Sequence, residues 1–233
     1  MCTMLQVFCL PANALHSVVV WCMSLLRLNE ENITRVLHRA VDILMAGGIV
    51  AYPTETFYGL GVKFDREDSL AKLHEIKQRP RDKALPIIIG SRELLAHLVL
   101  SVNDKAERLM KRFWPGPLTL IVPAKENLSL FITGGTHTVA VRIPGDSCAL
   151  RLAEYARFPI TATSANLSGN PPAQDAETVD RYFGDTIDLI IDGGPTKGTL
   201  PSTIADVTEG NLHIVREGTI KRELLLHALD SRN

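Results

Sequence analysis

The chain has 233 residues, of which 45% are hydrophobic and 22% are charged, and its formal net charge at pH 7 is −1. This size suits one globular domain with a large core, and the near-neutral charge excludes general electrostatic attraction to nucleic acid, so any RNA contact would need a local basic patch. The four cysteines lack the paired spacing of metal ligands. We therefore expect no zinc site, no disulfide framework and a reducing, cytoplasmic location.

The first 22 residues are apolar and uncharged, and the first basic residue is Arg27. A secretory signal places positive charge before its apolar segment, which this stretch does not do. Pro11, Asn13 and His16 interrupt the run of about 20 apolar residues that a membrane span requires. We expect residues 1–22 to be an extension outside the fold and residues 23–233 to form a single domain. A degraded targeting segment is the alternative.

Apolar residues recur at helical spacing between positions 33 and 44, and Gly47-Gly48 ends this helix before a strand at 49–52. Further helices are predicted at 70–76, 93–99, 104–113, 149–156, 176–183 and 221–228, and further strands at 85–89, 118–122, 139–143, 160–163, 187–191, 203–207 and 212–215. Strict alternation of strand and helix fails in the second half. We therefore expect an α/β (α+β) fold, with a mixed, twisted open sheet and flanking helices, rather than a Rossmann fold.

The stretch Tyr52-Pro-Thr-Glu-Thr-Phe-Tyr-Gly-Leu-Gly61 follows the strand at 49–52. A buried strand that ends in hydroxyl groups, a carboxylate and glycines is a common way to build a ligand site. The phosphate-binding loop, the dinucleotide fingerprint, the nucleophile elbow and the zinc-protease helix are all absent as sequence motifs. A phosphate-using enzyme would need another cradle.

Lys77, Arg79 and Lys83 form a basic cluster that could be this cradle. An arginine gives a forked contact to phosphate oxygens, and a lysine gives a point charge. The alternative is a solvated basic surface that also includes Lys72 and Arg81.

Arg142 lies near the end of an apolar strand, where burying its charge is costly unless the charge is paired. It either forms an ion pair with a neighbouring carboxylate or binds a ligand that carries a carboxylate. Trp114 is interpreted as core packing rather than as a platform for stacking a base.

Three later segments bring small polar groups. Ser164 and Asn166 follow a strand, where such residues also serve as helix caps or turns. The loop from Gly193 to Ser202 could form an anion nest from its backbone N–H groups, or be an ordinary surface loop. Arg216 precedes a glycine and could simply be a surface arginine in a β-turn.

In this order, the motifs resemble those of the YrdC-type L-threonylcarbamoyladenylate synthases of the YrdC/YciO-like family, over about positions 29 to 220. The resemblance implies ATP contacts by Lys77, Arg79, Lys83, Ser164, Asn166, Ser202 and Arg216, and threonine contacts by Thr54, Thr138 and Arg142. The chain departs from the family pattern at Pro172, where many relatives carry serine, and at Pro201, where an acidic residue is usual.

The resemblance also implies a reaction in which L-threonine, bicarbonate or carbon dioxide, and ATP give threonylcarbamoyl-AMP and pyrophosphate. Mg²⁺ would accompany ATP, held mainly by phosphate oxygens and water. No covalent nucleophile and no metal-ligating side chain are expected. The product would pass to a separate transferase that makes threonylcarbamoyladenosine in tRNA. The alternatives are a YciO-like paralogue with another acceptor, or a module that binds double-stranded RNA or tRNA without this activity.

Overall fold

The computed structural model describes residues 24–209 and 211–230. The predicted extension at residues 1–22, with Cys2, Cys9 and Cys22, lies outside these residues. Cys148 is a free, buried thiol. None of the described helices combines the length and the apolarity that crossing a membrane requires.

The strands form two sheets rather than the single sheet that we expected. The first sheet has the order β1 (Ser24–Arg27), β9 (Leu189–Asp192), β2 (Val50–Pro53), β3 (Tyr58–Gly61) and β8 (Thr163–Ser164). The pairs β1–β9 and β9–β2 are parallel, and the pairs β2–β3 and β3–β8 are antiparallel. The prediction of a mixed α/β fold is therefore confirmed, but the division into two sheets was not foreseen.

The second sheet has the order β11 (His213–Arg216), β10 (Thr203–Asp206), β5 (Leu118–Pro123), β6 (Thr138–Arg142), β4 (Ile87–Ile88) and β7 (Ile160–Thr161). Parallel and antiparallel pairs alternate across it. Pro86 and Ala162 flank its short strands β4 and β7, and the Ala162 N–H donates to the Pro86 carbonyl at 2.8 Å. Along β5 and β6, alternate residues face the core or the other side, as pleating requires.

The chain passes from one sheet to the other within the segment predicted as a single strand at 160–163. Thr161 belongs to the second sheet and Thr163 to the first. The Tyr52 hydroxyl donates to the Thr161 carbonyl at 2.7 Å, and the Thr161 hydroxyl accepts the Val62 N–H at 3.0 Å. A Cβ on Gly61 would lie 2.9 Å from the Thr161 carbonyl oxygen, so glycine permits this close approach.

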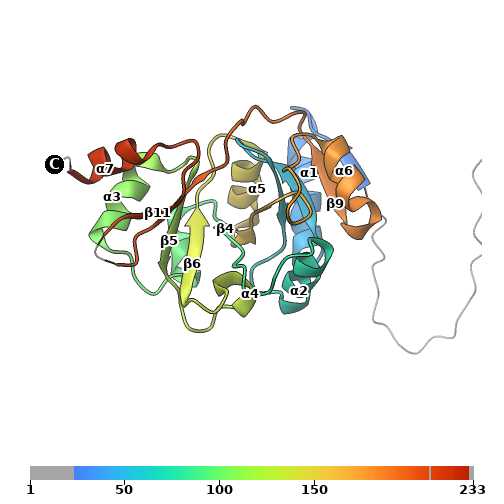
Figure 1. Ribbon diagram of the computed structural model, residues 1–233. Helices are drawn as coiled ribbons and strands as arrows, with labels where there is room; N and C mark the ends of the chain where they lie inside the picture. The colour runs from blue at the N-terminus through green and yellow to red at the C-terminus, as the bar shows by residue number, and fades with distance from the viewer. Residues whose placement is uncertain (1–23, 210, 231–233) are drawn as a thin grey trace, which may run out of the picture.

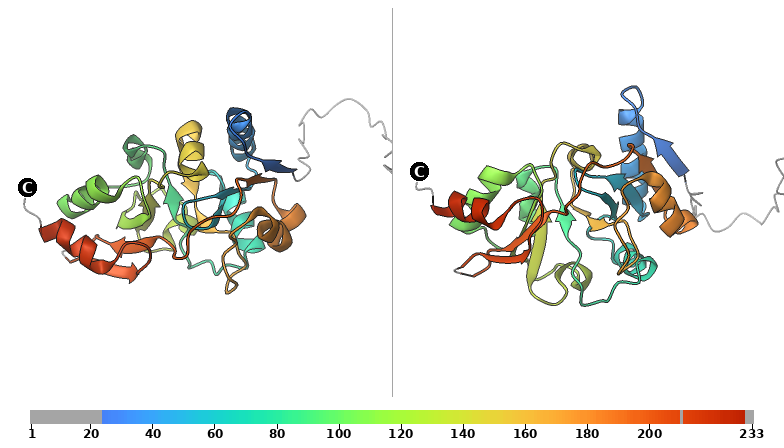
Figure 2. Two further views of the ribbon diagram at one scale, coloured as in Figure 1. Left: turned by 90° about the horizontal axis from the view of Figure 1, so that it is seen from above. Right: turned by 45° about the horizontal axis from the view of Figure 1, so that its top comes forward.

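Helices lie at both ends of the molecule and also between these ends (Figures 1 and 2). They are α1 (Ile33–Met45), α2 (Glu67–Ile76), α3 (Asp104–Phe113), α4 (Leu130–Thr133), α5 (Cys148–Ala156), α6 (Ala176–Phe183) and α7 (Arg222–Asp230), with short 3₁₀ turns at Arg92–His97 and Gly184–Thr186. Helices α1 and α5 pack on each other, α6 lies beside β9, and α3 packs against α7 next to the second sheet. The buried apolar side chains form two clusters, the smaller of which lies around α1 and α5.

Local chemistry explains several element boundaries. Asn103 begins α3 by accepting the Ala106 N–H at 2.9 Å, and Asp175 begins α6 by accepting the Thr178 N–H at 2.7 Å. Helix α3 ends before Trp114, whose indole is buried and donates to the Leu118 carbonyl at 2.7 Å. The interpretation of this tryptophan as core packing is confirmed.

Candidate active site

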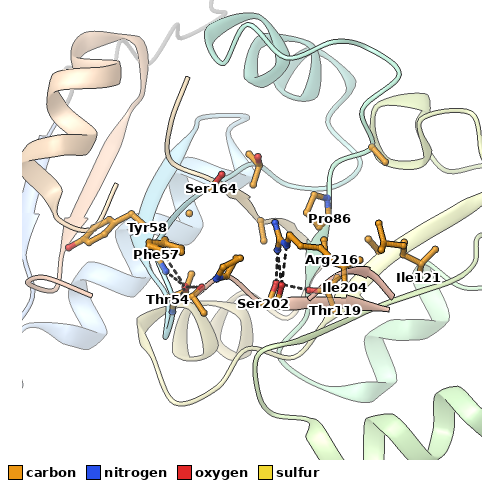
Figure 3. Close-up of a pocket in the computed structure, with 18 of the residues that line it drawn as sticks. Thr54, Phe57, Tyr58, Pro86, Thr119, Ile121, Ser164, Ser202, Ile204 and Arg216 are labelled. Atoms are coloured by element: carbon orange, nitrogen blue, oxygen red, sulfur yellow. Dashed lines mark hydrogen bonds between the residues drawn. The ribbon is translucent and has the colours of Figure 1, made fainter. Parts of the chain in front are cut away.

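A cavity of about 280 Å³ is lined by residues from both sheets and from the segments that end their strands (Figure 3). Its lining includes Thr54, Thr56, Phe57, Tyr58, Gly59, Arg79, Ala84, Pro86, Thr119, Ile121, Ala140, Ala162, Thr163, Ser164, Pro201, Ser202, Ile204, Val215 and Arg216. Segments more than 150 residues apart in the sequence therefore meet around one volume.

The turn between β2 and β3 supplies one wall. The Thr54 hydroxyl donates to the Phe57 carbonyl at 2.7 Å and accepts the Thr56 N–H at 3.0 Å. The two threonine hydroxyls lie 3.0 Å apart. A side chain that bonds the backbone two or three residues ahead fixes a tight turn, so Thr54 shapes this wall as well as lining it.

The loop before β10 passes against this turn. A Cβ on Gly198 would lie 2.2 Å from the Thr56 carbonyl oxygen, so this contact requires glycine. The Tyr58 hydroxyl anchors the loop by donating to the Gly194 carbonyl at 2.8 Å. Within the loop, Pro201 and Ser202 line the cavity.

The basic cluster separates into three different environments. After α2, Gln78 adopts a positive φ of 50°, a left-handed conformation that is common just past a helix end. The turn leaves Lys77 buried and Arg79 on the cavity wall, while Lys83 is exposed and does not line the cavity. Arg79 Nε donates to the Lys83 carbonyl at 3.0 Å, and its Nη2 donates to the Ala84 carbonyl at 2.8 Å.

Lys77 lies behind the segment that carries Ser164 and Asn166. Its ammonium donates to the carbonyl of Ser164 at 2.5 Å and to that of Asn166 at 2.6 Å. Burial, with a smaller contribution from the positive charge of Arg79, lowers the pKa of Lys77 to about 7. The two carbonyl oxygens favour the charged form and act in the opposite direction. Lys77 therefore contacts the backbone of the site rather than its open volume.

Ser164 lines the cavity, and Asn166 holds its turn together. The Ser164 hydroxyl donates to Asn166 Oδ1 at 2.5 Å, while Asn166 Nδ2 donates to the carbonyls of Leu167 at 2.9 Å and Asn170 at 2.8 Å. The sequence left two roles open for Asn166, a contact with the nucleotide or a place in a turn. These contacts show that it stabilises a turn. The Asn166 side chain is not among those that line the cavity.

On the opposite wall, Arg216 is tied to Ser202 (Figure 3). Its Nε and Nη2 donate to the Ser202 carbonyl at 3.2 and 2.9 Å, and Nη2 also reaches the Ser202 hydroxyl at 3.2 Å. The hydroxyls of Ser202 and Thr119 lie 3.2 Å apart. Part of the Arg216 side chain is exposed. Burial of the rest, together with the charge of Arg142, lowers its pKa, but a guanidinium stays protonated at neutral pH.

Arg142 forms an ion pair with Glu55 through Nη1 and Oε1. An ion pair with a carboxylate was one of the two roles that the sequence predicted for this arginine. The two side chains are 8% and 16% exposed, so the pair is largely buried. Ala140, two residues before Arg142 on the same face of β6, lines the cavity, whereas Arg142 and Glu55 do not.

Thr138 begins β6, about 13 Å from Arg142 along the strand at the usual rise per residue. Its hydroxyl lies 2.7 Å from that of Thr136. The structure does not bring Thr138 to the cavity wall.

The structure thus gathers half of the residues that the sequence analysis proposed. Thr54, Arg79, Ser164, Ser202 and Arg216 line the cavity, whereas Lys77, Lys83, Asn166, Thr138 and Arg142 do not. Thr119 also lines the cavity, although it was not predicted as a site residue. Strand alternation was the available signal, since Thr119 lies between the buried Leu118 and Leu120 and must face the other side of the sheet.

The cavity is suited to binding an anion. Its lining includes two arginines, Arg79 and Arg216, and no residue of its lining carries a carboxylate, an imidazole or a thiol. The described part of the chain contains no group of three or more histidine, cysteine, aspartate or glutamate side chains placed to hold a metal ion. Such a site can position and neutralise a charged substrate, and it lacks a nucleophile–histidine pair in its lining.

Comparison with known proteins identifies the family of the chain. The family Sua5_yciO_yrdC, described as "Telomere recombination", matches residues 42–218. The chain is 44% identical over 184 residues to a "Threonylcarbamoyl-AMP synthase" of Pyrococcus abyssi, covering 79% of this chain and 54% of that protein. The chain thus spans about half the length of this relative. It is 37% identical to a "Threonylcarbamoyl-AMP synthase" of Aliivibrio fischeri, covering 75% of this chain and 96% of that protein.

Among solved structures, the P. abyssi Sua5 protein complexed with L-threonine superimposes with a TM-score of 0.83 at 40% sequence identity. The match covers 89% of this chain and 61% of that one. Sequence and fold agree over most of the chain, which therefore belongs to the Sua5/YciO/YrdC family.

Proposed function

We propose that this chain is an L-threonylcarbamoyladenylate synthase, which forms threonylcarbamoyl-AMP and pyrophosphate from L-threonine, bicarbonate or carbon dioxide, and ATP. The observation that carries the proposal is the cavity whose lining combines two arginines, Arg79 and Arg216, with the hydroxyl-bearing residues Thr54, Ser164 and Ser202. Forked cations bind phosphate oxygens, and hydroxyl groups orient the remaining polar atoms of a nucleotide.

The charges around the cavity are those that a polyphosphate and a carboxylate require. Arg79 and Arg216 line it, and Arg142 lies close enough to Arg216 to affect its pKa. Glu55 neutralises one of these three cations. We assign the triphosphate to Arg79 and Arg216, and the threonine carboxylate to Arg142 next to Thr54.

The remaining predicted site residues take other roles in this proposal. Lys77 acts through the backbone of Ser164 and Asn166, which it holds in place. The exposed ammonium of Lys83 contributes long-range attraction for the anionic substrate rather than a contact in the cavity. No contact with the substrate is assigned to Thr138.

The chemistry needs positioning more than covalent help from the protein. The α-ammonium group of threonine first loses a proton to water, and the neutral amine then adds to carbon dioxide, which forms a carbamate and releases a second proton. A carbamate oxygen then attacks the α-phosphorus of ATP, and pyrophosphate leaves with the bonding electron pair. Charge accumulates on phosphate oxygens, where fixed guanidinium groups stabilise it. Mg²⁺ travelling with ATP would be held by phosphate oxygens and water, which are its preferred hard ligands.

The names of the relatives support this assignment, and the A. fischeri relative is matched over nearly its whole length. We further propose that the protein works in the cytoplasm and that its product is used by a tRNA threonylcarbamoyl transferase. The nearly neutral chain leaves at most a weak, local contact with RNA.

The test is to incubate the purified protein with labelled threonine, ATP and bicarbonate, and to measure pyrophosphate and an AMP adduct that carries the label. We expect both products, with release of pyrophosphate dependent on threonine and on bicarbonate. Equal release without threonine would indicate another acceptor, as in a YciO-like paralogue. Salt-sensitive RNA binding without ATP binding would indicate an RNA module and refute the proposal.

A further inference from the structure

Glu55 uses only one of its two carboxylate oxygens. Oε1 pairs with Arg142 Nη1, while Oε2 is buried and has no hydrogen-bond partner among the described residues. A buried anionic oxygen without a donor is unfavourable, and native structures rarely retain one unless it has a further use. The ion pair by itself therefore does not account for the whole carboxylate.

The position of Glu55 connects this oxygen to the cavity. Thr54 and Thr56 line the cavity on either side of it in the sequence. A Cβ on Gly145 would lie 3.3 Å from Glu55 Cγ, so glycine leaves room beside the glutamate side chain. Oε2 makes no hydrogen bond of its own, so it is the oxygen of this carboxylate that remains available to a ligand while Oε1 stays paired with Arg142.

We propose that Glu55 binds the α-ammonium group of the amino acid whose α-carboxylate is bound by Arg142, and so determines that the substrate is a free α-amino acid. This inference rests on the proposed function and concerns the amino-acid end of the same site. An α-amino acid carries opposite charges on neighbouring atoms, and a paired arginine and glutamate present the complementary charges side by side. No residue that lines the cavity carries a carboxylate, which leaves Glu55, between the lining residues Thr54 and Thr56, to bind the ammonium.

The negative charge of Glu55 beside Arg142 also explains how the site would select a ligand that carries both an amine and a carboxylate. Arg142 alone would attract any carboxylate, whether or not an amine accompanied it. With Glu55 in place, a ligand that has only a carboxylate is repelled by Oε2, whereas an amino acid satisfies it. Rejection of the wrong ligand through an unpaired buried group is an effective source of specificity.

The test compares three ligands by calorimetry in the presence of ATP: L-threonine, 3-hydroxybutyrate, which lacks the amine, and threoninol, which lacks the carboxylate. In the unmodified protein, we expect threonine to bind about 10- to 100-fold more tightly than 3-hydroxybutyrate, the value of one charge-assisted contact. Glu55→Gln should abolish this preference by weakening threonine binding and leaving 3-hydroxybutyrate binding equal or stronger. Glu55→Asp, which keeps the charge, should retain part of it.

Glu107→Gln is the matched control, because Glu107 also pairs with an arginine, Arg92, but on the exposed surface. It should leave all three affinities unchanged. Equal weakening of threonine and 3-hydroxybutyrate by Glu55→Gln would show that Glu55 only holds Arg142, and equal strengthening would show that it only competes for Arg142. Either result overturns the inference.

The unmodified protein keeps the inference testable even if a Glu55 variant does not fold. Suppose that threonine supports the release of pyrophosphate but binds the unmodified protein no more tightly than 3-hydroxybutyrate. This result overturns the role of Glu55 and leaves the proposed function standing. A clear preference for threonine without pyrophosphate release overturns the proposed function alone.

Discussion

Replacing Arg79 by alanine removes two kinds of interaction at once. The guanidinium holds the loop after α2 through the carbonyls of Lys83 and Ala84, at 3.0 and 2.8 Å. It also faces the cavity, where we assign it to the phosphates of ATP. The substitution should therefore lower both the stability of the fold and the affinity for ATP, by amounts that the structure allows us to separate.

The cost in stability should be small. Hydrogen bonds from a charged donor contribute about 1.5–3 kcal/mol each when buried, but one of these two is exposed, and water can replace the donor at both carbonyls. We expect a loss of about 1–2 kcal/mol, which lowers the melting temperature of a chain of this size by about 2–8 °C.

The loss of ATP affinity should be larger. One charge-assisted contact to phosphate is worth about 1.5–3 kcal/mol, which corresponds to about a 10- to 100-fold increase in the dissociation constant. Calorimetric titration with ATP measures this change, and thermal unfolding of the same sample measures the stability.

Arg81→Ala is the control, since Arg81 is an exposed arginine of the same loop that does not line the cavity. It should change either quantity by less than about 0.5 kcal/mol. Wild-type ATP affinity in Arg79→Ala would refute the assignment of Arg79. An equal loss in both variants would attribute the effect to the general charge of the loop.

Three further predictions concern other parts of the chain. Arg142→Ala should destabilise the protein by about 3–5 kcal/mol, because it leaves a buried carboxylate unpaired, and urea unfolding should reveal this; a loss below about 1 kcal/mol would show that the pair is effectively solvated. Burial, with a smaller effect of the Arg79 charge, lowers the pKa of His74, whose ring nitrogens have no partner among the described residues. The unfolded chain therefore binds more protons below about pH 6.5, so stability should fall as the pH drops below that value, and His74→Phe should flatten this decline in urea titrations at several pH values. Removal of residues 1–22 should leave the melting temperature and ATP turnover unchanged; a large loss of stability would place that segment in the core.

Local patterns in the sequence were sufficient for most helices. The apolar spacing from 33 to 44 predicted α1, and the range predicted for α6 agrees with its observed limits. An amphipathic helix repeats its contacts every three or four residues, so its position can be read without knowing its partner. The strands β1 and β3 were missed; β3 contains two glycines, which are depleted in strands and weaken its signal.

Neighbouring cations could not be distinguished in the same way. Lys77 and Arg79 are two residues apart, yet one is buried against the backbone of Ser164 and the other lines the cavity. The left-handed conformation of Gln78 separates the two side chains. A glycine at this position would have indicated such a turn in the sequence, whereas a glutamine does not. Two basic residues indicated an anion-binding site, but the sequence did not show that Arg79 rather than Lys77 would line it.

The sequence by itself determined the class of fold, the family and the kinds of chemical group available to the site. The tertiary structure decided how the strands divide between two sheets, which polar groups share the cavity, and that Arg142 pairs with Glu55, 87 residues earlier. The physical reason is that periodicity and turn chemistry act over a few residues, whereas the partner of a buried charge depends on which distant segments pack together.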